Sequence, residues 1–126
     1  MSTIFDASDK VLKRIEPLKV PFDGSPSDLR AFLINVKGRV KAAGWQDICQ
    51  YQDINDNTVN LLKDHARFTH ENLEDFHNSR TNASKIDKAD EFFQFLFGSL
   101  SKDFQNELIN DLEIEDGPLA YKVIMD

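Results

Sequence analysis

The sequence is poor in the features that mark secreted, membrane-spanning and disulfide-bonded proteins. Cys49 is the single cysteine among 126 residues, which excludes an internal disulfide and a multi-cysteine zinc site. No apolar run approaches the roughly 20 residues that a membrane-spanning helix needs. The first residues also lack the basic-then-apolar order of a signal peptide. We therefore expect a cytoplasmic protein that has no membrane partner.

Positive charge and glycine are scarce as well. The 15 Lys and Arg residues are outnumbered by 22 Asp and Glu residues, and the net charge is −7. An acidic chain repels phosphate backbones, so we do not expect this chain to bind nucleic acid by itself. The five glycines are widely separated, which excludes a glycine-rich phosphate loop.

The residues that are abundant indicate a folded helical domain. Hydrophobic residues make up 40% of the chain, and ten of the aromatic residues are phenylalanine, which has no polar group and belongs in a core. No segment alternates between apolar and polar residues for long enough to predict a strand. The sequence therefore predicts an all-α fold, a compact bundle of about six or seven helices. The length suits one domain.

The clearest predicted helix spans residues 26–43. Its apolar residues recur with helical spacing, Pro26 suits a first helical position after a Ser25 cap, and Gly44 suits the C-terminal cap. Gly38 lies inside this helix and weakens it by about 1 kcal/mol relative to alanine. Further helices are predicted at about 57–67, 70–79 and 85–99, from Ser101 onward, and at 119–125.

The predicted organisation is an N-terminal arm over residues 1–20, with a possible short helix, followed by a helical domain over residues 21–126. Phe22 follows Pro21 and precedes the turn at Gly24. We expect this aromatic ring to be buried as the anchor between the arm and the core. Residues 117–126 are a candidate start of a second domain.

Two groups of side chains resemble metal sites, and we expect neither to hold a metal. His70, Glu74 and His77 share one face of a predicted helix, but no HExxH pairing is present, so surface positions are the better interpretation. Residues 53–64 begin like a calcium loop, but Thr58 stands where that loop needs glycine. Since no nucleophile or other catalytic set is found either, we expect no cofactor and no enzymatic activity.

Four segments, in this order, resemble the capsid region of Gag proteins from LTR retrotransposons of the copia type and related elements. Residues 21–32 resemble the Gag pattern of an aromatic residue, a glycine, a polar turn and a helix, and residues 44–48 resemble the segment after that helix. Residues 92–104 resemble the central capsid helix and the turn that follows it. Residues 116–124 resemble the acidic-Gly-Pro opening of a later helix. The four segments are PFDGSPSDLRAF, GWQDI, FFQFLFGSLSKDF and DGPLAYKVI.

The resemblance implies a retroviral-capsid-like fold, mainly of the N-terminal capsid domain. It implies a structural protein whose partner is another copy of itself and which assembles into a shell, an intracellular virus-like particle, that packages the element's RNA. RNA would be bound by Gag regions outside this chain. The helices at 26–43 and 57–67 would then line the contacts between subunits. Candidate self-association residues are Arg30, Lys37, Lys41 and Lys63.

An alternative function stays open at this point. A Gag-derived domain domesticated by a host binds a peptide or protein instead of assembling a shell. A groove flanked by Phe92, Phe95 or Phe97 would then take an amphipathic or extended segment.

Overall fold

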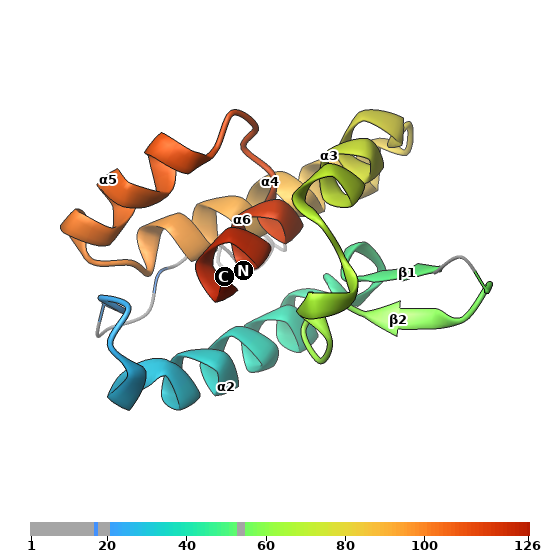
Figure 1. Ribbon diagram of the computed structural model, residues 1–126. Coiled ribbons are helices and arrows are strands. Elements are labelled where there is room, and N and C mark those ends of the chain that lie inside the picture. Colours follow the sequence, from blue (N-terminus) through green and yellow to red (C-terminus); the bar gives the residue numbers. More distant parts are fainter. Residues whose placement is uncertain (1–16, 18–20, 53–54) are drawn as a thin grey trace, which may run out of the picture.

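The computed structural model describes residue 17 and residues 21–52 and 55–126. Helices α4 and α6 pack side by side at the centre, and α3 and α5 both contact α6. Helix α2 runs along one edge, and a small hairpin lies beyond its C-terminal end (Figure 1). The elements are α2 (Pro26–Ala43), η1 (Gln46–Ile48), β1 (Gln50–Gln52), β2 (Thr58–Asn60), η2 (His65–Arg67), α3 (His70–Ser79), α4 (Ala83–Gly98), α5 (Lys102–Asp111) and α6 (Gly117–Met125).

The described part is mostly helical, as predicted, but the count of six or seven helices is not reached within it. It contains five α-helices, two short 3₁₀ helices and one two-stranded sheet. The predicted N-terminal arm with its short helix lies outside the described residues, apart from Pro17.

Helix α2 has the predicted bounds, Pro26–Ala43. Gly44 ends it in the left-handed conformation, with φ of 75°, and its N–H donates to the Lys41 carbonyl. The Ser25 hydroxyl does not form the predicted cap. It hydrogen-bonds the Ser27 hydroxyl at 2.7 Å instead, so the fixed φ of proline and the C-terminal glycine are what define this helix.

The predicted helix at 57–67 is wrong. Strands β1 and β2 pair antiparallel here, with Tyr51 opposite Val59, and the Leu61 N–H extends the pairing to the Cys49 carbonyl at 2.8 Å. Val59 and Leu62 have helical spacing, but Leu61 is buried as well. The backbone pairing with β1 outweighs the helical spacing of these apolar residues, and the turn after β2 buries Leu61 and Leu62 together.

The remaining helices begin at polar caps. Thr69 forms a reciprocal capping box with Asn72, each accepting a backbone N–H of the other at 3.0 Å. Asn82 caps α4 through the Lys85 N–H at 3.1 Å, so α4 begins at Ala83, two residues before the predicted position. Ser101 caps α5 as predicted, and Asp116 caps α6.

The aromatic residues of α4 form the centre of the core. Phe92 and Phe95 are fully buried and contact the Trp45 ring, with centroids 5.3 and 6.0 Å apart. Because both rings are buried, they cannot flank an exposed peptide groove. Phe92 and Phe95 therefore do not flank the groove considered for the domesticated alternative. Phe97, its third candidate, is partly buried and stacks on Phe93.

Phe22 is buried, as predicted, with 4% of its surface exposed. Its ring stacks on Phe32 of α2 at a centroid distance of 4.3 Å. Its backbone N–H donates to the Ser99 carbonyl and its carbonyl accepts from the Ser101 N–H, both at 2.8 Å. Phe22 thus joins α2 to the turn between α4 and α5.

Helix α6 belongs to the same core. Leu119, Ala120 and Tyr121 are buried, and the Tyr121 hydroxyl donates to the Leu62 carbonyl at 3.3 Å. The suggestion that a second capsid domain begins at residue 117 stays a prediction.

Candidate functional site

Three of the four predicted self-association residues line one surface hollow. Lys37 and Lys41 come from α2, and Lys63 follows β2; together they line a hollow of about 210 Å³. Arg30 is exposed on the same helix but lies toward its N-terminus, outside the hollow. The structure therefore brings together Lys37, Lys41 and Lys63 and separates Arg30 from them.

The apolar lining of this cationic hollow is set by the fold. Val40 lies one turn from Lys37 on α2, and Leu62 comes from the turn after β2. Asn60 fixes that turn, because its side-chain oxygen accepts the Leu62 N–H at 2.9 Å and its carbonyl accepts the Lys63 N–H at 3.1 Å. The hollow depends on the hairpin, which holds Leu62 and Lys63 against α2.

The electrostatics of the cationic hollow favour an anionic partner. None of its three lysines is in an ion pair with a carboxylate among the described residues, and no carboxylate lines it. On a chain with a net charge of −7, this is a local surplus of positive charge. Such a surface attracts carboxylates and other anions that carry some apolar surface.

Cys49 also lines the hollow but supplies no reactive thiol. Cys49 is 1% exposed. Burial, with a smaller contribution from Asp47, raises the pKa of its thiol to about 12. The thiol is therefore protonated at neutral pH, and its role in the floor of the hollow is that of a small apolar side chain.

An exposed isoleucine extends this surface along α2. Ile34 is 60% exposed, although α2 buries Phe32, Val36 and Val40 on its other side. Arg30, Ile34, Lys37 and Lys41 follow one another at intervals of four, three and four residues, so they form one stripe, called here the α2 ridge. Ile34 was not among the residues predicted from the sequence, although its position off the inner apolar stripe of this helix is the signal that identifies it.

Gly38 lies on the same stripe, between Ile34 and Lys41. A Cβ atom at this position would meet nothing within 4 Å. Packing within the described chain therefore does not require a glycine there, and the missing side chain lowers the middle of the α2 ridge.

Two of the three residues of the metal hypothesis, His70 and His77, pair with different carboxylates. His70 Nε2 lies 2.8 Å from an Asp126 carboxylate oxygen, and His77 Nδ1 lies 3.1 Å from Asp116 Oδ1, whereas Glu74 is exposed. Among the residues that the structure describes, no group of three or more His, Cys, Asp or Glu side chains is arranged to hold a metal ion.

In the second metal hypothesis, the calcium loop, the residues that the structure describes take part in other local structure. Thr58 begins β2, and Asp64 forms an ion pair with Arg67 at 3.0 Å. Asp53 and Ile54 lie outside the described residues.

A buried ionic network was not predicted from the sequence. Asp116, with 0% of its surface exposed, accepts hydrogen bonds from the Arg80 guanidinium and from the Leu119 N–H. Arg80 also donates to the Tyr51 hydroxyl at 2.8 Å. Burial alone would lower the pKa of Arg80, but the facing Tyr51 and Asp116 raise it above its ordinary value. This network links β1, the end of α3 and the start of α6, and its partners are too far apart in sequence to be paired by spacing.

Comparisons of the chain with protein-family models, with curated proteins and with solved structures found no match. Among the described residues, no helix is both long enough and apolar enough to span a membrane.

Proposed function

We propose that this chain is a structural capsid-like domain of the Gag type, which self-associates into a shell that packages retrotransposon RNA. The observation that carries the proposal is the gathering of Lys37, Lys41 and Lys63 around one hollow without ion-pair partners among the described residues. These lysines are the candidates that the Gag resemblance suggests for contacts between subunits.

The charge distribution supports a protein partner of acidic character. A second copy of this chain is such a partner, because its net charge is −7. The same net charge disfavours direct RNA binding, so in this proposal the RNA is held by other Gag regions. The proposed domain works by assembly in cytoplasmic virus-like particles and carries out no catalytic reaction.

Sedimentation velocity over a concentration series tests the proposal. We expect the protein to sediment faster as its concentration rises, and the double variant Lys41→Glu/Lys63→Glu to stay monomeric over the same range. Association should also weaken as salt is raised from about 0.1 to 1 M, because the Debye length falls from about 10 to 3 Å.

The matched control is Lys85→Glu/Lys102→Glu, which changes the net charge equally at two exposed lysines outside the cationic hollow. This control should associate like the unmodified protein. A protein that stays monomeric at every concentration and salt level refutes self-association. Equal loss of association in both double variants refutes the role of the hollow.

A further inference from the structure

A second hollow, of opposite charge, lies between α5 and α6. It has a volume of about 500 Å³ and is lined by apolar side chains that include Phe104, Val123 and Ile124. Glu107 and Asp111 of α5 also line it. These two carboxylates are four residues apart, so they lie on the same side of the helix. We call this hollow the acidic groove.

The carboxylates of α5 are available to a partner. Neither Glu107 nor Asp111 forms an ion pair with any described residue, and both are exposed. The third carboxylate of the acidic groove, Asp126, is already held by Lys122 at 2.9 Å and by His70 at 2.8 Å. Glu107 and Asp111 thus form an uncompensated anionic edge beside an apolar floor.

The α2 ridge has the complementary character. Its Ile34 is apolar and exposed, and Lys37 and Lys41 follow on the same stripe as cations without ion-pair partners among the described residues. The groove offers an apolar floor with carboxylates, and the ridge offers an apolar side chain with ammonium groups. The missing side chain at Gly38 lets another helix approach the middle of the ridge.

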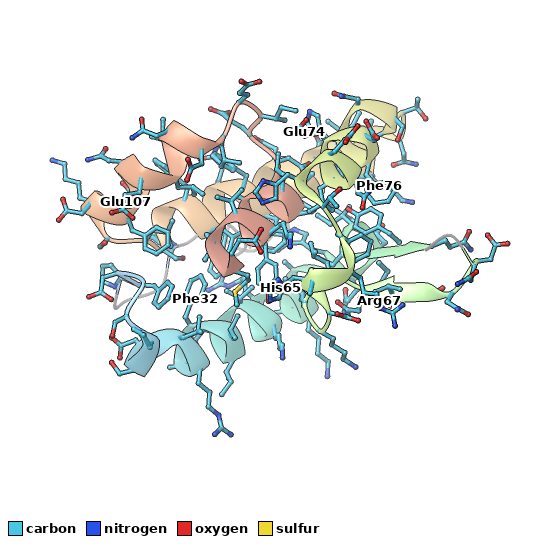
Figure 2. All side chains as sticks on the ribbon, viewed as in Figure 1. Phe32, His65, Arg67, Glu74, Phe76 and Glu107 are labelled. Atoms are coloured by element: carbon cyan, nitrogen blue, oxygen red, sulfur yellow. The ribbon has the colours of Figure 1, made fainter. Side chains whose placement is uncertain are left out.

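One copy cannot bring these two surfaces together. Helices α2 and α5 lie at opposite edges of the helical layer, with α4 and α6 between them (Figure 1). Figure 2 shows Phe32 of α2 directed toward the interior, and it shows Glu107 on α5. Because the ridge is on the side of α2 opposite the buried Phe32, it faces away from the acidic groove of its own chain.

We propose that the α2 ridge of one copy docks into the acidic groove of the next copy. Ile34 enters the apolar floor, and Lys37 and Lys41 face Glu107 and Asp111. This inference rests on the proposed self-association and specifies its contact. Two different surfaces meet in it, so each added copy leaves one ridge and one groove free. Such a head-to-tail contact closes into a ring or continues as an extended assembly.

Two neutral variants test the contact. The ridge variant is Ile34→Asn/Lys41→Gln, and the groove variant is Glu107→Gln/Asp111→Asn; neutral residues avoid creating a new charge pair between the variants. Each variant alone should be monomeric in sedimentation velocity where the unmodified protein associates. An equimolar mixture should form one species of twice the 14.5 kDa chain mass and grow no further, because each variant retains one intact surface.

The matched controls make the same kinds of substitution at exposed positions outside the ridge and the groove. Lys85→Gln/Ile86→Asn matches the ridge variant, since Ile86 is also exposed at 46%. Glu71→Gln/Asp75→Asn matches the groove variant, with two exposed carboxylates four residues apart on α3. Both controls should associate like the unmodified protein.

The outcomes separate this inference from the proposed function. If the unmodified protein is monomeric throughout, self-association itself is refuted. If it associates and the groove variant does too, or if the mixture of variants stays monomeric, the ridge meets another surface and the inference is refuted. Circular dichroism verifies the fold of each variant. Should a double variant fail to fold, the single changes Ile34→Ala and Glu107→Gln decide. Each should raise the dissociation constant of self-association, Ile34→Ala by roughly tenfold or more.

Discussion

Replacing Arg80 by methionine should be among the most destabilising single substitutions in this chain. The guanidinium side chain is 8% exposed, and its carboxylate partner Asp116 is fully buried. Methionine keeps much of the length and the apolar contacts of the side chain. It removes the charge and the donors to Asp116 and Tyr51.

The expected cost follows from what Arg80→Met leaves behind. Asp116 would keep the Leu119 N–H and His77, whose side chain is 34% exposed, but it would lose its buried cation. Breaking a buried ion pair by removing one partner costs about 3–5 kcal/mol. Against a total stability of about 5–15 kcal/mol, this lowers the melting temperature by roughly 10–20 °C.

Urea denaturation followed by circular dichroism at pH 7 measures this cost. The control is Arg67→Met, because Arg67 pairs with Asp64 on the surface with 56% of its side chain exposed. An exposed pair contributes about 0–1 kcal/mol. If Arg80→Met costs no more than Arg67→Met, the buried network does not stabilise the fold as argued.

The double variant Arg80→Met/Asp116→Asn completes a thermodynamic cycle. Each single change leaves one buried charged group without its partner, whereas the double change removes both charges. The double variant should therefore cost less than the sum of Arg80→Met and Asp116→Asn, by about 0.5–3 kcal/mol. Additive costs would show that the two side chains are not coupled.

Three further predictions concern local packing and pH. Since the Cys49 pKa rises from 9.0 to about 12 on folding, the free energy of unfolding should fall above pH 9 by up to about 1.4 kcal/mol per pH unit. The variant Cys49→Ala should show a smaller decline in denaturation curves measured between about pH 8 and 11. Gly38→Ala should stabilise the fold by about 1 kcal/mol in thermal unfolding, because the added methyl meets open space. Gly117→Ala should destabilise it by about 1–3 kcal/mol in urea, because its Cβ would lie 2.6 Å from Phe92 Cβ.

The helices were predictable where their ends are encoded by neighbouring residues. Pro26 and Gly44 bound α2, and Thr69 begins α3 through a bond to a residue three positions away. Such signals need no knowledge of the rest of the fold. The hairpin has no comparable signal, because its strands are three residues long and no alternation can be detected over that length. The burial of Leu61 and its bond to Cys49 are what determine it.

The candidate site was predictable in its residues and not in its geometry. The sequence identified Lys37, Lys41 and Lys63 as exposed cations, and all three are exposed. Their gathering depends on the hairpin, a segment for which the sequence predicted a helix. The acidic groove was missed for a related reason. Glu107 and Asp111 share a helix face, but the apolar floor exists only because α6 packs against α5.

The backbone pairing of Phe22 has a mechanical consequence. A pull that reaches Phe22 from its N-terminal side loads the two 2.8 Å hydrogen bonds that Phe22 makes with Ser99 and Ser101. The paired segments run parallel, so both bonds are sheared together and must break together. The stacked ring of Phe22 must also leave Phe32 in the same step. Tension from preceding residues is thereby carried to the turn between α4 and α5 before it reaches α2, so this helix keeps its position while the chain before it is under load.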